Sequence, residues 1–513
     1  MKKRAFKMLA VLLMFVPVGP IVLTGAFLFE EHLRGGLSLA HYRRELAARG
    51  EKLTPQALTE DRPTGENGAP EIIAAASQLK KGEVMPDHYP PRMRLTDSGR
   101  AVVGFREEDW IEGGVTYRWD QLGSDCETNE AALQRVCAAL QKPVLDNALD
   151  HSQGALMRYK HLIPPKQLSQ WFGARAQFEL HEQNLRAAAE DLAAQIRLVR
   201  ALARDQIIIS ELVRVAIASV ARSGTWEGLQ DDAWSDSDLA TLQRAWTDQH
   251  FATGMIGGYQ GELVFADVSY QQCRASNHWA FQMLFGLEQY AEESDRPLWE
   301  QALRSIPRGE LVADFLKEQI YCRIWRFAWL DQDERHYLGK LEELLSVMRT
   351  AAADKSLLKV RSALSRLEEQ DATRNLYDRL RYPQYQSFFT LPRCVVRAMR
   401  AETERSLVLC AIALKRYALR HEGAAAPNLE ALVPDFLPSV PTDYMDGLPM
   451  KYRFNGDGSF VLYSVGEDGK DDGGNASLAP GKSSLRDLWS RKDLIWPAPA
   501  TAAEIEAFRE AEK

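Results

Sequence analysis

The pattern of apolar and polar positions divides the chain into an N-terminal apolar run, a long helical stretch and a shorter C-terminal stretch with alternation. Met8 to Phe29 contains twenty-two residues without a charge, enough for a helix to cross a bilayer, which takes about 20. Four basic residues precede this run, and Glu30 and Glu31 follow it directly. The positive-inside rule then leaves the N-terminus in the cytoplasm. We therefore predict a single-pass anchor at residues 1–30 in a cell inner membrane, with the bulk of the chain in the periplasm.

A cleaved signal peptide is the alternative interpretation of the same run. Met8 to Val16 has the length of a signal-peptide hydrophobic region, and Thr24 to Ala26 places small residues at a cleavage-site spacing. No Cys directly follows the run, which excludes a lipoprotein anchor. Both interpretations export the rest of the chain.

The segment that follows the apolar run has weak patterning. Leu53 to Pro70 carries three Pro among Thr, Asp and Gly, a composition that predicts a linker. Residues 71–80 predict a short Ala-rich helix. The runs at 101–105 and 115–119 lie on either side of a Gly-Gly pair and predict a small hairpin.

The middle of the chain, to about residue 391, has helical periodicity almost throughout. Residues 178, 185, 192 and 199 are apolar and seven apart, with a companion row at 189, 196 and 203, which predicts a helical seam buried against another helix. Ile207 to Val220 is apolar on most faces, so we expect it in the middle of a bundle. The aromatic residues between Phe315 and Leu330 predict packed core. A second seam in a later helix consists of Leu338, Leu341, Leu345, Met348 and Ala352.

The last hundred residues change from helical to alternating patterning. An apolar helix runs to His421, and Gly423 supplies a stop signal. Residues 427–434 form a short turn between prolines. Residues 450–454 alternate apolar and polar, and 459–465 returns as a second strand after a Gly-rich turn. The pattern predicts a long helix followed by a β-hairpin.

This C-terminal region resembles the globular domain of the type II secretion major pseudopilins. In that family a long helix ending in Tyr and Gly leads to a Leu-rich turn closed by Pro, a Pro-x-Asp segment, and a strand ending in Tyr-Ser-x-Gly-x-Asp-Gly. The resemblance covers about 80 of the 513 residues. The matching positions, in chain order, are Tyr417, Gly423, Leu429 to Pro434, Pro441, Asp443, Gly447, Tyr452, Tyr463, Ser464, Gly466, Asp468 and Gly469.

The resemblance implies an α+β head and a Ca²⁺ ion in the loop after the last strand. The Val465 carbonyl and the Asp468 carboxylate fall on ligand positions of the family, and Asp471 and Asp472 are the additional ligands. The composition agrees, because residues 466–474 contain four acids and four glycines, and Ca²⁺ takes six to eight oxygens from flexible loops. The alternative is an exposed acidic turn without an ion.

The chain also departs from that family. Its N-terminus lacks the processed Gly-Phe-Thr-Leu-Ile-Glu motif, and Ala424 to Pro427 stands where the family has Tyr-Pro. A long helical region separates the apolar run from the head, so assembly into a pilus by the family's mode is excluded. The layout resembles bacterial membrane-anchored proteins that carry this domain.

Charge and cysteine content narrow the function classes. The net charge is −8 and the pI is near 5.8, so we predict no nucleic-acid partner, because such proteins need a basic face. The six Cys form no C-x-x-C pair, which removes zinc knuckles and thioredoxin motifs. Cys126 and Cys137 are the closest pair, and export leaves a disulfide open.

Catalytic motifs are incomplete or absent. His181-Glu182 lacks the second His of a zincin, since position 185 is Leu, and there is no Gly-x-Ser-x-Gly elbow. Gly481 to Ser483 resembles the end of a phosphate-binding loop, but its first glycine is replaced by Ala476. Glu262 and Asp267 could form a paired-carboxylate site, although solvated helix acids are far commoner. We assign no catalytic residue.

Together these patterns predict a mainly α protein with an N-terminal membrane helix, a large helical bundle and a small C-terminal α+β head. The predicted function is that of a membrane-anchored extracytoplasmic structural or protein-interaction protein, with partners in an envelope or secretion assembly. The alternative is an extracytoplasmic enzyme whose site lies in the helical region, and a solute-binding protein is a third class. The predicted divisions are 1–30 anchor, 31–127 linker, 128–391 bundle, 392–490 head and 491–513 tail.

Overall fold

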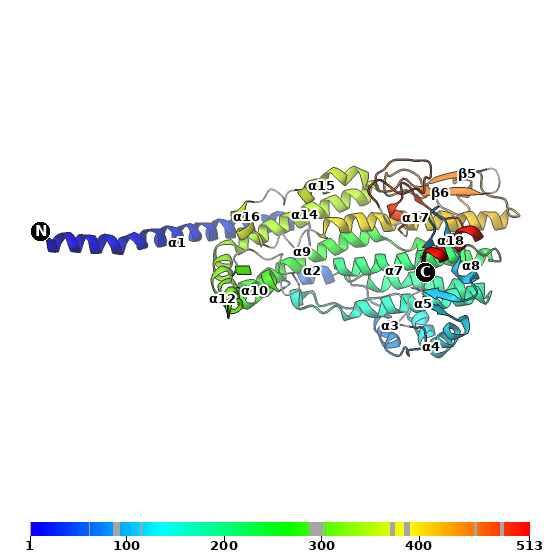
Figure 1. The fold of residues 1–513 in the computed structure, drawn as a ribbon, viewed down its shortest axis with the longest axis horizontal. Helices are drawn as coiled ribbons and strands as arrows, with labels where there is room; N and C mark the ends of the chain where they lie inside the picture. The colour runs from blue at the N-terminus through cyan, green and yellow to red at the C-terminus, as the bar shows by residue number, and fades with distance from the viewer. Residues whose placement is uncertain are drawn as a thin grey trace.

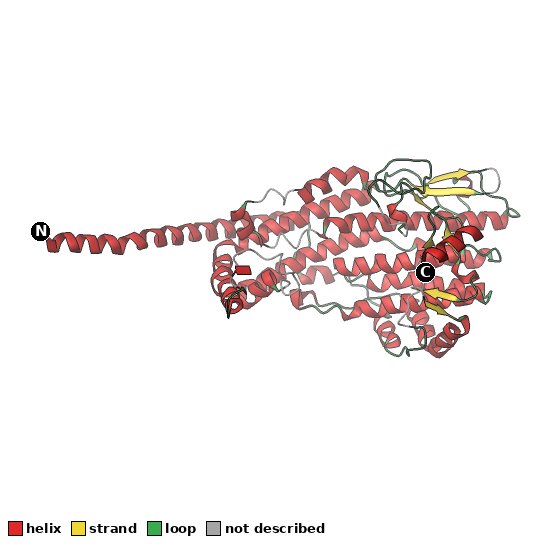
Figure 2. Ribbon diagram, viewed as in Figure 1, coloured by secondary structure: helices red, strands yellow, loops and turns green. Residues whose placement is uncertain are grey.

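The computed structural model describes a mainly helical molecule, elongated along one axis, with strands confined to small sheets (Figure 1; Figure 2). This architecture agrees with the mainly α prediction. Residues outside the description are 1, 61, 86–92, 113–114, 287–300, 303, 370–374, 384–389, 456–458, 483–486 and 513. The side chains, but not the backbone, of residues 2–18, 112, 155 and 512 are also outside it.

Long helices form the body, and shorter ones lie between and around them (Figure 1). The longer helices are α1 (Lys2–Ala48), α4 (Trp119–Leu140), α5 (Ile163–His181), α6 (Leu185–Arg197), α7 (Ile208–Gly228), α8 (Asp236–Thr247), α9 (Phe251–Ala275), α14 (Leu330–Asp354) and α17 (Pro392–Arg420). The shorter helices are α2 (Pro55–Thr59), α3 (Ala69–Ala76), α10 (Asn277–Phe285), α12 (Gly309–Phe315), α13 (Cys322–Ile324), α15 (Arg361–Glu369), α16 (Leu376–Arg381) and α18 (Ala502–Glu512).

Helix α1 projects from one end of the molecule, and only its later part packs on the body (Figure 1). Leu39, Tyr42 and Leu46 are buried, and α1 packs mainly against α14. Among the residues that the structure describes, no helix combines the length and apolar character needed to cross a membrane. Residues 8–18, half of the predicted span, lie outside the described side chains. The membrane anchor therefore stays a prediction.

Helix α7 lies in the middle of the body, as the sequence predicts. It packs against α5, α6, α9 and α17, and Ile217, Ala221 and Trp226 are buried along it. The first turns of α7 also bury two charged residues, Glu211 and Arg214, which form an ion pair. Pairing is what permits this, since an isolated buried charge is strongly unfavourable.

The seam predicted across residues 178–203 is divided between two helices. Helix α5 ends at His181 and α6 begins at Leu185, and the two pack against each other. Gln183, with φ of 61°, adopts the left-handed conformation that ends helices. Leu192 and Val199 are buried as predicted. The second seam is confirmed within α14, where Leu338, Leu341, Leu345 and Met348 are buried and Ala352 is partly buried.

The predicted aromatic core between residues 315 and 330 is correct only in part. Two π-helical stretches, Leu316–Tyr321 and Trp325–Trp329, surround α13. Trp325 and Trp329 are buried, but Phe315 and Phe327 are exposed. Part of the apolar surface of this region therefore faces outward.

The C-terminal region contains the predicted helix and hairpin. Helix α17 ends at Arg420, and Gly423 follows with φ of 87°, as expected of a helix stop. Strands β5 (Lys451–Phe454) and β6 (Phe460–Ser464) pair antiparallel, although residues 456–458 of the predicted turn lie outside the description. Helix α17 packs against β6. A short helical turn spans Glu430–Leu432, as predicted.

Several contacts cross the boundaries between the predicted segments. The predicted tail supplies strand β7 (Leu494–Ile495), which pairs with β6, so it completes the head. The predicted linker packs on the body, where Leu58 is buried with Val264 and Val268. Helix α17 belongs to head and bundle alike, since it packs against α7, α8 and α9 as well as β6.

The predicted hairpin near residue 113 exists with a different first strand. Strand β3 (Trp110–Glu112) pairs with β4 (Val115–Tyr117), and Gly113-Gly114 between them lies outside the description. The run at 101–105 instead contributes β2 (Ala101–Val102), which pairs with β1 (Arg94–Leu95). The Ala-rich helix predicted at 71–80 is α3.

Candidate functional site

The acidic loop after β6 was the predicted calcium site, and its three predicted carboxylates are exposed. Asp468 and Asp471 each accept the backbone N–H group two positions later, at 3.0 Å. Asp471 also accepts the hydroxyl of Tyr463 at 2.9 Å. The N–H of Asp472 donates to Asp493 Oδ1 at 3.4 Å. These hydrogen bonds close turns of the loop and do not gather the carboxylates at one point.

Metal-ligand clusters are also absent elsewhere in the described part of the chain. There, no three side chains of His, Cys, Asp or Glu are grouped closely enough to hold one metal ion. The calcium site at Val465, Asp468, Asp471 and Asp472 stays a prediction, because bound ligands can reorganise a flexible, glycine-rich loop.

Asp493 organises this loop from outside it, which the sequence patterns did not indicate. Its side chain is fully buried, and its Oδ2 accepts the N–H groups of Gly474 at 2.9 Å and Asn475 at 2.8 Å. Burial raises the pKa of Asp493, and these backbone donors oppose that shift. The local sequence gives little indication of this role, because Asp493 follows Arg491 and Lys492 and directly precedes the short apolar strand β7.

Asp443 holds the other side of the head. Its carboxylate is fully buried and accepts N–H groups from Met445 at 3.0 Å and Val465 at 2.9 Å. Burial raises its pKa to about 6, while the backbone donors favour the ionised form. Asp443 thus ties the turn before β5 to the end of β6, which is a structural role.

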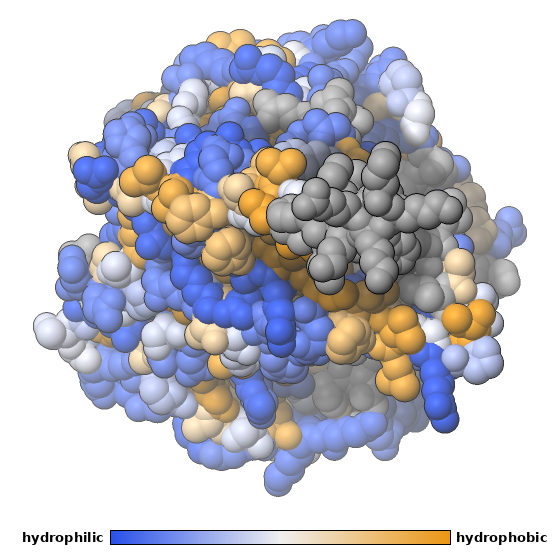
Figure 3. Space-filling view, turned by 90° about the vertical axis from the view of Figure 1, so that its left-hand side faces the viewer, coloured by the Kyte–Doolittle hydropathy of each residue, from blue (hydrophilic) through white to orange (hydrophobic). Residues whose placement is uncertain are grey.

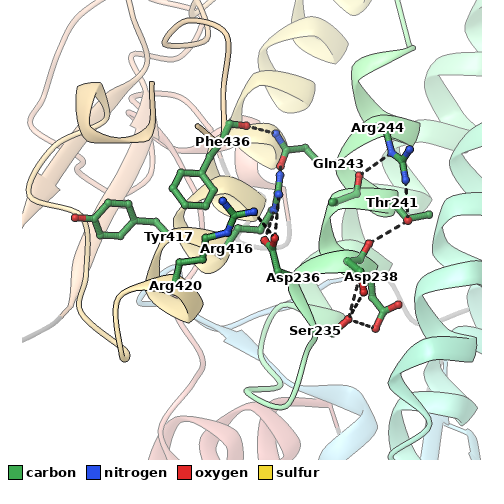
Figure 4. A network of polar contacts seen from close by, with 12 residues as sticks. Ser235, Asp236, Asp238, Thr241, Gln243, Arg244, Arg416, Tyr417, Arg420 and Phe436 are labelled. Carbon is green, nitrogen blue, oxygen red and sulfur yellow. Dashed lines mark hydrogen bonds and ion pairs between the residues drawn. The ribbon is translucent and has the colours of Figure 1, made fainter. Parts of the chain in front are cut away.

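The head is joined to the bundle by a polar network between α17 and α8 (Figure 4). Arg416 donates to Asp236 Oδ1 at 2.7 Å and to Gln243 Oε1 at 2.9 Å. Arg420 donates to Asp236 Oδ2 at 2.6 Å. Gln243 in turn donates to the carbonyl of Phe436 at 2.6 Å. The hydrogen bond from Arg416 is the main reason that the pKa of Asp236 is lowered.

The Phe436 ring lies over this network. Its centroid is 5.6 Å from the guanidinium of Arg416, 5.0 Å from that of Arg420, and 5.8 Å from the ring of Tyr417. Such contacts between cations and aromatic faces add modest attraction at exposed sites. Tyr417, one of the residues that match the pseudopilin pattern, therefore helps to seat the turn after α17 on α8.

A buried cluster of charges attaches α1 to the bundle. Glu334 of α14 is fully buried and pairs with Arg43 of α1 and with Arg274 of α9, the latter at 2.6 Å. Arg43 also pairs with Asp267 at 2.5 Å, and Arg274 with Asp331. Each carboxylate in this cluster has an arginine partner. Burial raises the pKa of Glu334 and of Asp267, and the arginines oppose that shift.

Asp267 and Glu262, considered as a carboxylate pair, have different surroundings. Asp267 belongs to the arginine cluster, whereas no ion pair or hydrogen bond to the Glu262 side chain is present among the described residues. Desolvation raises the pKa of Glu262 to about 7. Its titratable neighbours include Tyr159, Tyr259 and Tyr337. The two acids do not share a site.

The enzyme alternative places its site in the helical region, where a partly polar pocket is present. A cavity of about 460 Å³ lies between α9 and α10, and no carboxylate of the described residues lines it. Its lining residues are Ser269, Gln272, Cys273, His278, Trp279, Gln282, Met283 and Gly286.

His181 and the cysteines have structural roles. The ring of His181 stacks on Trp119 with centroids 4.3 Å apart, and its Nδ1 lies 2.9 Å from the carbonyl oxygen of Phe105. All six Cys are free thiols, so the Cys126–Cys137 disulfide left open by the sequence is not formed. Burial raises the pKa of every one of these thiols, which makes them poor nucleophiles.

The head also carries an apolar groove of about 320 Å³ between the end of α17, the hairpin and the segment after β7. Leu414 and Ala418 lie on one side, Tyr452 and Phe460 on another, and Trp496 to Pro499 close it.

Comparison of the chain with models of known protein families, with curated proteins and with solved structures found no match.

Proposed function

We propose that this protein is a membrane-anchored, extracytoplasmic interaction protein whose helical body carries a pseudopilin-like head. The observation that supports this most directly is the placement of α1 and the hairpin at opposite ends of the long axis (Figure 1). A protein held by α1 would present β5 and β6 away from its attachment. Glu334 pairs with two arginines, and the buried Asp443 and Asp493 accept backbone N–H groups, so these acids hold the body and the head together.

The anchor is supported by the apolar surface of α1 outside the body. Ile21, Val22, Leu23 and Phe29 are all exposed, Leu23 to 72% of its surface. They continue the uncharged run that begins at Met8. Apolar side chains exposed along a projecting helix are unfavourable in water and suit a bilayer.

The head is proposed as the contact surface for a protein partner of an envelope or secretion assembly. Its groove is mainly apolar and lined by Tyr452, Phe460 and Trp496, and aromatic side chains are enriched where proteins bind one another. A Ca²⁺ ion in the loop at residues 465–472 remains part of this proposal. Chelation should then lower the melting temperature of the full-length chain, and Asp468→Asn should remove that response.

The attachment is tested by membrane fractionation of cells expressing the full-length chain. We expect the protein to stay with membranes in alkaline carbonate, and a C-terminal tag to be digested by protease in spheroplasts. Release by carbonate, or a protected tag, would contradict the proposal.

The head contact is tested by placing a photocrosslinking residue at Phe460 in those cells. We expect a defined adduct from the photocrosslinking residue at position 460. The control position is Ile163, an exposed apolar residue outside the groove, where the same residue should form no such adduct. An adduct pattern shared by both positions would argue against a specific contact on the head.

A further inference from the structure

An exposed apolar surface surrounds the place where α1 leaves the body. Part of it lies on α12 and the π-helical stretches after it, where Leu311 is 68% exposed and Val312, Phe315, Ile320 and Phe327 are also exposed. These positions recur at helical spacing, so one outward face is apolar. A helix face of this kind is expected to be covered by something other than water.

The short helix α16 continues this surface. Leu376 is 75% exposed, and Tyr377 and Leu380 are exposed beside it. The hydroxyl of Tyr321 donates to the carbonyl of Leu380 at 2.8 Å. This bond joins α16 to the stretch that follows α12, so the two apolar faces are parts of one surface.

Both parts contact α1 at the same level. The hydroxyl of Tyr377 donates to Glu31 Oε2 at 2.9 Å, and its ring lies 6.4 Å from that of Phe27. The Phe327 ring stacks on His32 with centroids 5.0 Å apart. Residues 27–32 are where the uncharged run ends and the first charges after it, Glu30 and Glu31, are found.

The view onto this end shows hydrophobic side chains gathered near the middle of a face that is otherwise largely hydrophilic (Figure 3). Three exposed arginines, Arg308, Arg323 and Arg379, lie on the same segments. The acids of α12, Glu310 and Asp314, are both paired with Arg304. Apolar residues with basic neighbours at their edge are typical of helices that lie in a membrane interface.

We propose that the exposed apolar faces of residues 306–327 and 376–380 rest in the headgroup region of the bilayer that holds α1. A bilayer occupied by Met8 to Phe29 would have its surface at residues 27–32, the level at which both faces contact α1. The arginines would then face lipid phosphates. Two contacts, a spanning helix and this surface, would fix the tilt of the body on the membrane. This inference rests on the proposed membrane attachment.

The test uses the full-length chain in vesicles of phosphatidylethanolamine and phosphatidylglycerol. A bimane fluorophore is attached to Leu311→Cys or to Leu376→Cys, and phospholipid brominated near the headgroup serves as quencher. Leu358→Cys is the matched control, because Leu358 is an exposed leucine that lies against Gly469 of the head. The unsubstituted chain corrects for labelling of native cysteines.

We expect quenching at positions 311 and 376 to exceed that at 358 several-fold. Equal quenching at the three positions in chains that float with vesicles would overturn this inference and leave the attachment standing. Failure of the chains to float would overturn both. Energy transfer between labelled copies at position 311, without lipid quenching, would assign the surface to a second copy and also overturn the inference.

Discussion

Helix α1 and the C-terminal head are each attached to the bundle by arginine and carboxylate pairs, but water reaches the two sets of charges differently. Glu334, which receives Arg43 and Arg274, has no exposed side-chain surface. Asp236, which receives Arg416 and Arg420, is 31% exposed. Removing a partner of a buried charge leaves it unsolvated, whereas water replaces a partner at the surface. The same pair chemistry should therefore contribute very unequally to stability.

The largest effect is expected from Arg274→Met. This change leaves Asp331 without its arginine and Glu334 with Arg43 alone, and should lower the free energy of unfolding by about 3 kcal/mol. Urea denaturation of the full-length chain in detergent measures it. Arg274→Lys, which keeps the charge, is the control and should lose less. Equal losses in the two variants would show that packing, not charge, dominates.

Glu262 is expected to make the stability of the helical body sensitive to pH. Its folded pKa, about 7, is raised above the ordinary value of 4.5, so the folded state binds the proton more tightly. The contribution of Glu262 to the free energy of unfolding should then be fully present below pH 4.5. It should be lost as the pH rises through 7. Glu262→Gln should remove that slope, with a gain of roughly 2 kcal/mol at pH 8. Melting curves across pH measure it, and parallel profiles would contradict it.

In the head, Asp443→Asn should lower the free energy of unfolding by about 2 kcal/mol. The NH2 group of Asn would face a backbone N–H whose hydrogen bond the carboxylate now accepts. The N–H groups of Met445 and Val465 bind different oxygens of Asp443, and Asn keeps only one oxygen, so one of the two N–H groups would lose its acceptor. Asp446→Asn is the matched control, since Asp446 accepts one backbone N–H, from Leu448, in an exposed bond. Urea denaturation should give a larger loss of unfolding free energy for Asp443→Asn than for Asp446→Asn. Similar losses in the two variants would mean that burial of Asp443 has little effect.

The smallest effect is expected at the head junction itself. Arg420→Ala removes one of two arginines from Asp236 and should cost less than about 1 kcal/mol, with the loss shrinking at high salt. A loss that rivals that of Arg274→Met would erase the distinction between the two attachments.

Local features of the chain were predicted where local physics decides them. The seam of α14, the stop at Gly423 and the β5–β6 hairpin follow from periodicity and turn chemistry within short windows. Errors occurred where a window was ambiguous. Nothing near Gln183 resembles a strong breaker, yet its left-handed conformation divides the predicted seam.

The sequence by itself determined that the protein is mainly helical, that an uncharged run follows its first basic residues, and that a helix and hairpin lie in its C-terminal region. Only the tertiary structure decided that α17 serves bundle and head together, that β7 completes the sheet, and that Arg43 meets Glu334 across 291 positions. The reason is the sequence separation between the residues that decide each feature. Helices and turns are set by neighbours a few residues apart, whereas the partner of a buried charge or an edge strand is chosen by how the whole chain packs.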